Sequence, residues 1–268
     1  RYKEAVVDYS KAIELDPNQI WFLCSLGDLL SEEFGRHSEA ATLYRKAIEL
    51  DPKNADSWFR LGITLALHPD FRSEAETAYR KAIELAPSFV GAWNNLGTLL
   101  DKQKRHAEAE SAYRTAIKLA PNDAPPWTNL GHILRRNLTC LHEAETAYRM
   151  AIELDPNSAI PRYALADLLA RRDGDLQEAF FHASKGMMIK PSDGFATRVF
   201  RKLCFTHPES LRSVLPEVSH WCVQHPDDPS VLGFTVDAWI AFAKCTTWVE
   251  ALALLDAHHQ PLELVDDL

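Results

Sequence analysis

The sequence has little glycine, and it has no stretch of alternating apolar and polar residues that would indicate a β-strand. Only 10 of its 268 residues are glycine, and the missing alternation favours an all-helical chain. Hydrophobic residues make up 46% of the sequence and charged residues 25%. This composition excludes the apolar-poor, charge-rich profile of disordered proteins, so we expect a folded helical protein with a real core.

Cysteines are few, and their spacing does not suggest disulfide or metal-binding pairs. The five cysteines are an odd number, lie in apolar helical stretches and form no C-x-x-C motif. This usage is typical of a reducing compartment, so we expect a cytoplasmic protein, or a nuclear one. We interpret the cysteines as small buried hydrophobic residues rather than as metal ligands or reactive thiols.

Long apolar runs are also missing. No run approaches the roughly 20 residues that a membrane-spanning helix needs, and the first four residues, Arg1 to Glu4, do not resemble a signal peptide. No membrane partner is expected. Because the chain starts without Met inside an evident helix, we interpret it as a piece of a longer protein.

Excess positive charge is a further absence. The formal net charge is −9, which repels phosphate backbones at long range and provides no counterion release on binding DNA or RNA. We therefore expect no nucleic-acid partner. RNA binding by a helical repeat remains the least favoured alternative.

A regular period runs through the sequence. The strings Ala-Ile-Glu-Leu-Asp-Pro and Ala-Ile-Lys-Leu-Ala-Pro, with close variants, place five prolines 35, 35, 34 and 35 residues apart, and three more continue at intervals of 35. Proline ends one helix and opens the next because it cannot donate a hydrogen bond inside a helix. Each period therefore predicts two helices. The eight periodic prolines are Pro17, Pro52, Pro87, Pro121, Pro156, Pro191, Pro226 and Pro261.

Two stripes of residues define the helix faces that pack together. The second helix of each unit carries Ala, Tyr and Ala at i, i+4 and i+7, as in Ala40, Tyr44 and Ala47. The first helix carries Trp, Leu and Gly, as in Trp58, Leu61 and Gly62. Glycine inside a helix costs about 1 kcal/mol relative to alanine, so its recurrence indicates close helix crossings.

These W-x-x-L-G and A-x-x-x-Y-x-x-A motifs with their late proline resemble the tetratricopeptide repeat. The resemblance implies an all-α fold, a right-handed α-solenoid (superhelix) of antiparallel helix-turn-helix units. We expect repeats over 1–193, with a partial unit at 1–19 followed by units at 20–54, 55–89, 90–123, 124–158 and 159–193. Residues 194–268 are expected to form degenerate hairpins that close the solenoid, because Val214 and Arg201 replace small residues of the pattern there.

A concave strip is expected on the first helices, opposite the Trp/Leu/Gly stripe, from residues 4, 8, 11 and 15 positions after each proline. Its early end is acidic, its middle is rich in amides and its later part is more basic. Asn95 and Asn129 hold equivalent positions one repeat apart, where amides can grip a peptide backbone. The candidate partner-binding residues are Arg60, Asn95, Thr98, Lys102, Asn129, His132, Arg136, Tyr163 and Arg171.

Residues on the first helices distinguish subclasses of tetratricopeptide repeat proteins that bind different partners. Repeat modules that clamp chaperone C-terminal carboxylates use a Lys where this chain has Cys24, Phe59, Asn94 and Thr128, so binding of a chaperone tail is not expected. The two asparagines are similar to the asparagine ladder of O-linked sugar (GlcNAc) transferases, although only two rungs are present.

Catalytic and metal-binding patterns are missing. The sequence contains no phosphate-binding glycine loop, H-E-x-x-H or G-x-S-x-G string. The histidine groups His207/His220/His225 and His258/His259 lack the i, i+4 spacing that shares a helix face. We therefore expect no enzymatic activity, no cofactor and no metal.

The leading hypothesis is a protein-interaction scaffold that binds an extended peptide or a partner domain. The alternative is a regulatory or substrate-recruiting arm of a larger enzyme, such as a glycosyltransferase, kinase or protease, whose catalytic domain lies outside this chain. Aromatic residues are dense over 195–250, and any that are exposed would favour self-association through the C-terminal hairpins.

Overall fold

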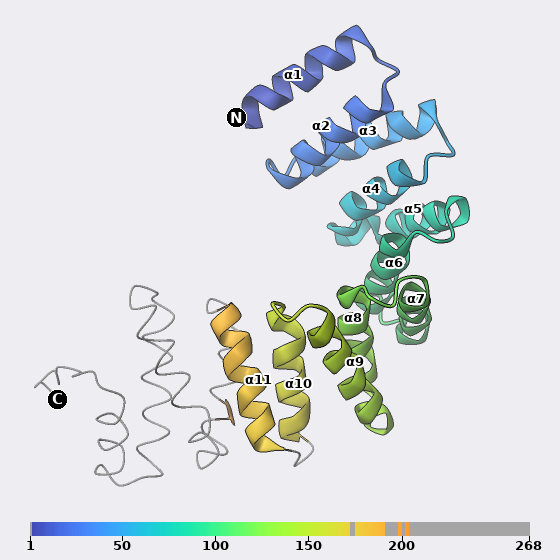
Figure 1. Ribbon diagram of the computed structural model, residues 1–268. Coiled ribbons are helices and arrows are strands. Elements are labelled where there is room, and N and C mark those ends of the chain that lie inside the picture. The colour runs from blue at the N-terminus through green and yellow to red at the C-terminus, as the bar shows by residue number, and fades with distance from the viewer. Residues whose placement is uncertain (1, 172–174, 191–197, 200–201, 204–268) are drawn as a thin grey trace, which may run out of the picture. The chain divides into compact units, whose positions relative to one another are not determined.

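The computed structural model describes residues 2–171, 175–190, 198–199 and 202–203, and this part of the chain is all-α with no strand (Figure 1). The all-helical prediction is confirmed. Two 3-10 turns, η1 (Pro69–Phe71) and η2 (Leu138–Cys140), precede second helices. The α-helices are α1 (Tyr2–Leu15), α2 (Ile20–Glu32), α3 (His37–Leu50), α4 (Ala55–Ala66), α5 (Arg72–Leu85), α6 (Val90–Lys102), α7 (His106–Leu119), α8 (Ala124–Leu134), α9 (Leu141–Leu154), α10 (Ala159–Arg171) and α11 (Leu176–Ile189).

The chain divides into two compact units. Unit 1 is Arg1–Ile133 and unit 2 is Leu134–Leu268. In unit 1, α2 packs on α3, α4 on α5 and α6 on α7, and successive hairpins stack through α3 against α4 and α5 against α6. In unit 2, α9 packs on α10 and α10 on α11. In each unit these helices thus pack against their neighbours in sequence and form stacked helical hairpins.

The core of each hairpin in unit 1 is a tyrosine laid against a glycine. The ring of Tyr79 is 2% exposed, and a Cβ built on Gly62 would lie 2.7 Å from its Cδ1. Gly97 stands in the same relation to Tyr113, at 2.6 Å from Cε1. The alanines of the second helices, such as Ala75 and Ala109, are fully buried. Small residues therefore let the two helices approach closely around one aromatic ring.

Each proline turn is tied to the helix that follows it. The indole Nε1 of Trp58 donates to the carbonyl oxygen of Pro52 at 3.0 Å. Trp93 and Trp127 repeat this contact with their own prolines at 2.9 Å, so the three tryptophans occupy equivalent places. At Arg162 the guanidinium replaces the indole and donates to the Pro156 carbonyl at 2.8 Å. The local interaction is kept while the residue type changes.

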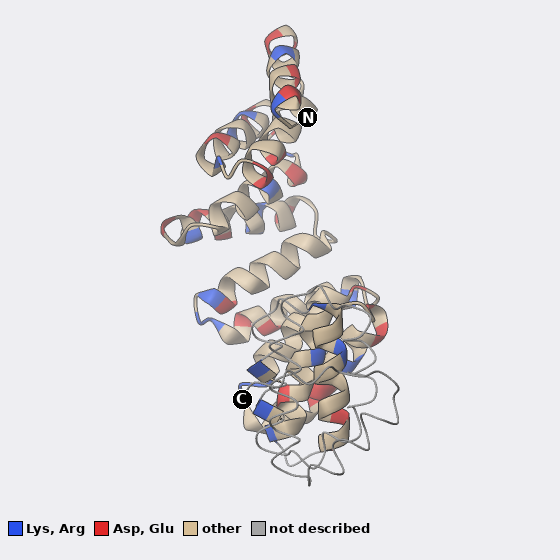
Figure 2. Ribbon diagram, turned by 90° about the vertical axis from the view of Figure 1, so that its left-hand side faces the viewer, with Lys and Arg blue, Asp and Glu red and all other residues tan. Residues whose placement is uncertain are grey.

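Exposed ion pairs link consecutive second helices. Arg45 on α3 pairs with Glu74 on α5 at 2.7 Å, Arg80 on α5 with Glu108 on α7 at 3.5 Å, and Arg149 on α9 with Glu178 on α11. Basic and acidic residues accordingly occur together on the same helices of unit 1 (Figure 2). Pairs this exposed contribute little stability each, and they leave the outer face with mixed charge.

In the hairpin of α10 and α11 the tyrosine lies on the first helix and the glycine on the second, the reverse of the hairpins in unit 1. Ala166 and Ala183 stand where other hairpins have Gly and Tyr. The aromatic ring comes instead from Tyr163 on α10, which is 1% exposed. Gly186 on α11 makes room for it, because a Cβ there would lie 2.4 Å from the Tyr163 ring. The hairpin keeps one ring against one glycine but takes them from the opposite helices.

Candidate protein-binding surface

The first helices of unit 1 carry a polar surface, which we call the first-helix surface. It is built by residues 8, 11 and 15 positions after each proline. Of its predicted members, Lys102 is exposed, and the others in unit 1 are half-buried: Arg60, Asn95, Thr98, Asn129 and His132.

An amide cluster lies at the middle of this surface. Asn129 on α8 donates from Nδ2 to Oδ1 of Asn94 on α6 at 2.9 Å. The Asn94 amide in turn reaches Oδ1 of Asn95 at 3.5 Å. Burial raises the pKa of the Tyr79 phenol, and a hydrogen bond with Asn95 opposes part of that rise. The amides are thus held in place by one another and by the tyrosine beneath them.

Thr98 belongs to the same network. Its hydroxyl donates to the Asn94 carbonyl at 3.1 Å and accepts from the Tyr113 hydroxyl at 3.2 Å. The tyrosine that fills the hairpin core therefore presents its polar end to the first-helix surface. Core packing and surface geometry are set by the same side chain.

The acidic end of the surface is an ion-pair network. Asp28 accepts from the Tyr44 hydroxyl at 2.7 Å and pairs with Arg60, which also pairs with Asp56 at 2.6 Å. Burial alone would lower the pKa of the Arg60 guanidinium, but the hydrogen bonds with the two carboxylates outweigh it and hold that pKa above its usual value. Burial and the Asp28 contact raise the pKa of Tyr44. One guanidinium here serves two carboxylates.

Two apolar side chains also hold register positions of the first-helix surface. Ile63 on α4 and Leu67, the residue that follows α4, are 38% and 55% exposed, and they hold the positions 11 and 15 residues after Pro52. The first-helix surface of unit 1 therefore offers charged, apolar and amide contacts on three successive first helices.

In unit 2, Arg136 and Arg171 are exposed as expected for surface residues. Tyr163 is different, because it lies in the core with its hydroxyl donating to the Gly186 carbonyl at 3.1 Å. We correct the expectation that Tyr163 contacts a partner. The reversed packing of α10 and α11 turns this position inward.

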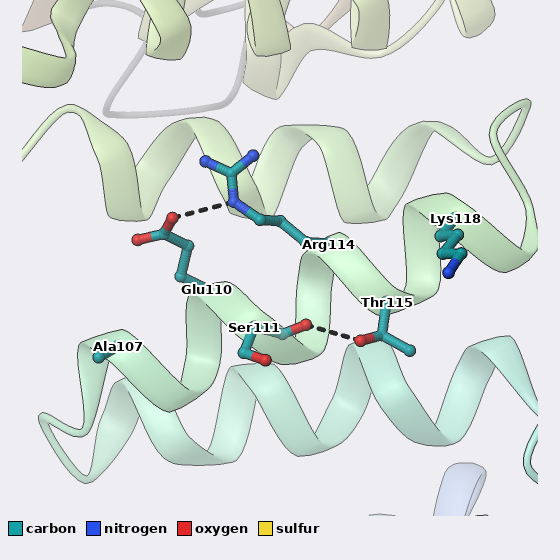
Figure 3. A pocket seen from close by; sticks show the side chains of 6 residues that line it. All are labelled: Ala107, Glu110, Ser111, Arg114, Thr115 and Lys118. Atoms are coloured by element: carbon teal, nitrogen blue, oxygen red, sulfur yellow. Dashed lines mark hydrogen bonds and ion pairs between the residues drawn. The ribbon is translucent and has the colours of Figure 1, made fainter.

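A shallow hollow of about 500 Å³ lies along α7 (Figure 3). All six lining residues come from this one helix, namely Ala107, Glu110, Ser111, Arg114, Thr115 and Lys118. Glu110 and Arg114 pair along the helix at 2.9 Å, and the Thr115 hydroxyl donates to the Ser111 carbonyl at 2.8 Å. Glu110 and Thr115 are engaged within the helix and all lining residues come from one helix, so the first-helix surface is the better candidate.

Sequence reasoning placed Asp28 and Asp167 on the predicted strip but gave no partners for them, and it did not place Asn94 there. Asn94 and Asp28 complete the contacts of Asn129 and Arg60, and Asp167 joins Arg171 at 2.7 Å. Asp28 and Asp167 share one register position, which was the available signal. Asn94 lies one position off the expected strip, so no periodicity would have found it.

The described residues contain neither a cluster of metal-ligating side chains nor a helix that could span a membrane. No group of three His, Cys, Asp or Glu side chains there could hold a metal ion. Among the helices described, none combines the length and apolarity that crossing a bilayer requires.

Solved structures with the same fold are numerous. YrrB, described as a TPR protein with an unusual peptide-binding site, is 24% identical over 71% of this chain and 96% of its own, with a TM-score of 0.53. PilF of Pseudomonas aeruginosa is 21% identical over 88% and 99%, with a TM-score of 0.61. MamA of Desulfovibrio magneticus RS-1 is 23% identical over 65% and 97%, with a TM-score of 0.55. These likenesses establish the fold, and no curated protein sequence matches the chain.

Family models cover the first part of the chain without a substantial gap. Models described as TPR repeat or tetratricopeptide repeat match residues 1–32 and 33–68, 70–124, and 124–158. The matched segments contain the proline turns, the tryptophan contacts and the Gly–Tyr crossings of unit 1. The chain belongs to the tetratricopeptide repeat family.

Proposed function

We propose that this protein is an interaction scaffold that holds an extended segment of a partner protein on the first-helix surface of unit 1. Repeat proteins of this class serve as scaffolds for protein interaction. The proposal that the partner binds on this surface depends on the hydrogen bond between Asn129 and Asn94. This bond joins α6 and α8 through two side-chain amides at the first-helix surface.

An extended peptide presents N–H and C=O groups at regular intervals. A side-chain amide has both a donor and an acceptor, so an array of amides can satisfy a backbone without selecting its sequence. Because Asn94 and Asn129 already restrain each other, little side-chain entropy is lost when they bind. Neighbouring Ile63 and Leu67, both exposed, would contribute apolar contacts to the partner's side chains.

The test is affinity capture of protein partners with the intact chain and with the variant Asn95→Ala/Asn129→Ala. Truncating contacts at the centre of a binding surface weakens binding by about 1–2 kcal/mol each, so we expect captured partners to be lost or to bind about tenfold or more weakly. The matched control is Ser111→Ala/Thr115→Ala on α7, which removes two hydroxyls from the hollow of Figure 3.

Circular dichroism of both variants checks that the helices persist. Partners retained at equal strength by the asparagine variant would refute the proposed surface. Partners lost only in the α7 control would move the binding site to the outer face of the second helices.

A further inference from the structure

A buried carboxylate on α10 is surrounded by cationic side chains. The Asp167 side chain is 8% exposed, and its Oδ2 lies 2.7 Å from Nη2 of Arg171. Arg135, which follows α8 and belongs to unit 2, places Nη1 3.4 Å from the same oxygen. Lys202 places Nζ 3.8 Å from Oδ1. Three cations therefore converge on one acid.

The same charges also act on a buried tyrosine. The buried hydroxyl of Tyr148 on α9 experiences the charges of Arg135, Asp167, Arg136 and Arg171 together. We call Arg135, Arg171 and Lys202, which all face Asp167, the basic cluster. In the part of the chain that the structure describes, Asp167 is the single acidic residue paired with Arg135 and Arg171, so these two arginines exceed their shared acid by one positive charge.

The equivalent place in unit 1 has the opposite balance. Asp28 stands 11 residues after its proline, as Asp167 does, and it too pairs with an arginine, Arg60. There a second carboxylate, Asp56, joins the same guanidinium at 2.6 Å. The register position alone therefore does not produce a basic surface, and the excess of cations is particular to unit 2.

The basic cluster is open to a ligand. The side chains of Arg171 and Lys202 are 61% and 54% exposed, and that of Arg135 is 30% exposed. A guanidinium carries five N–H donors in a planar fork. The single Asp167 oxygen that Arg135 and Arg171 share leaves donors of both forks for a second carboxylate, and Asp167 holds the two forks in place for it.

We infer that the basic cluster binds acidic side chains, Asp or Glu, in a segment of a partner protein. This inference rests on the proposed scaffold function but concerns residues of unit 2 rather than the asparagines of unit 1. Nucleic acid fits less well, because the chain's net charge of −9 repels a long polyanion while a local cluster still attracts one or two carboxylates.

The test measures the binding of defined peptides to the full chain by fluorescence anisotropy. One labelled peptide has Glu and Asp spaced by Gly and Ser, and its matched partner has Gln and Asn at the same places. We expect the acidic peptide to bind about tenfold more tightly or better, because charge-assisted contacts are about twice as strong as neutral ones. Raising salt from about 0.05 M to about 0.3 M should weaken it several-fold.

Variants locate the site. Arg171→Gln removes the most exposed arginine that pairs with Asp167, so we expect about three- to tenfold weaker binding of the acidic peptide. Arg171→Lys should recover part of that loss. Arg36→Gln is the control for net charge, because Arg36 on unit 1 is 47% exposed and pairs locally with Glu39. Circular dichroism confirms that each variant is folded.

Four results would overturn the inference: no preference for the acidic peptide, no effect of Arg171→Gln, an equal loss in Arg36→Gln, or tighter binding of a single-stranded RNA oligonucleotide that displaces the peptide. The variant Asn95→Ala/Asn129→Ala should bind the acidic peptide as the intact chain does. If the chain shows no preference for the acidic peptide, the affinity-capture result for unit 1 is unaffected. The two proposals can therefore fail independently.

Discussion

Lys104 is the described non-glycine residue with a positive φ, 64°, and replacing it with glycine should stabilise unit 1. It lies in the turn between α6 and α7, where its N–H donates to the Asp101 carbonyl at 2.8 Å and that of Arg105 donates to Leu100 at 2.9 Å. The corresponding turn between α2 and α3 has Gly35 at φ 63°. The same backbone geometry is thus built once with glycine and once with lysine.

The magnitude follows from two opposing effects. The left-handed conformation costs a residue with a Cβ roughly 1–2 kcal/mol, and Lys104→Gly removes this strain. Glycine raises the entropy of the unfolded chain, which opposes the gain by about 0.5–1 kcal/mol. The Lys104 side chain is exposed, so little packing is lost. We expect Lys104→Gly to raise the free energy of unfolding by a net of about 0.5–1 kcal/mol. The stability of Lys104→Asn should lie between those of the intact chain and Lys104→Gly, because asparagine tolerates the left-handed conformation better than lysine.

The assay is urea unfolding followed by circular dichroism and by tryptophan fluorescence. Stacked repeats need not unfold in one step, so the two probes should be compared before a free energy is assigned. The matched reverse change, Gly35→Lys, should lower stability by about 1 kcal/mol. Lys104→Gly that lowers the urea midpoint, or Gly35→Lys without any loss, would refute the reasoning.

Three further predictions concern the hairpins and their turns. Trp93→Phe keeps an aromatic side chain but removes the indole N–H that donates to the Pro87 carbonyl, so stability should fall by about 0.5–1.5 kcal/mol in urea unfolding; an unchanged midpoint would show that the contact is dispensable. Gly186→Ala drives a Cβ into the Tyr163 ring, 2.4 Å away, and should cost about 1–3 kcal/mol, most of which Gly186→Ala/Tyr163→Leu should recover if the clash is the cause. Burial lowers the pKa of His182 to about 4, so the unfolded chain takes up this proton first and stability falls as pH drops from about 6.5 towards 4, by on the order of 1–2 kcal/mol at pH 5. Thermal melting at pH 7.5 and pH 5 should show a smaller loss for His182→Gln than for the intact chain, and an equal loss would contradict this assignment.

The hairpin fold could be predicted because its determinants recur. Proline, tryptophan and glycine return at one register, and each is explained by a local contact such as that of Trp58 with Pro52. A period of about 35 residues repeated five times indicates a repeat architecture, and the i, i+4, i+7 stripes within each period indicate that its elements are helices. The predictions for residues 194–268, including self-association through the aromatic-rich hairpins, lie outside the described residues except at 198–199 and 202–203 and stay predictions.

The site could be predicted only in outline. Helical geometry placed Asn95, Asn129 and Arg60 on the surface because a repeat fixes which face is exposed. It did not give their partners, since Asn94 reaches Asn129 from a neighbouring register position. It also failed at Tyr163, because the direction of that ring depends on Gly186, a residue on the next helix.

The exchanged ring of α10 and α11 limits how this sequence can change. Grafting a tyrosine at Ala183 while Tyr163 remains would crowd two rings into one hairpin, and removing Tyr163 first would leave a void beside Gly186. Either intermediate loses stability, so the two packing solutions are separated by unfavourable single steps. A design that gives this hairpin the packing of the other hairpins must replace four residues together: Tyr163, Ala166, Ala183 and Gly186.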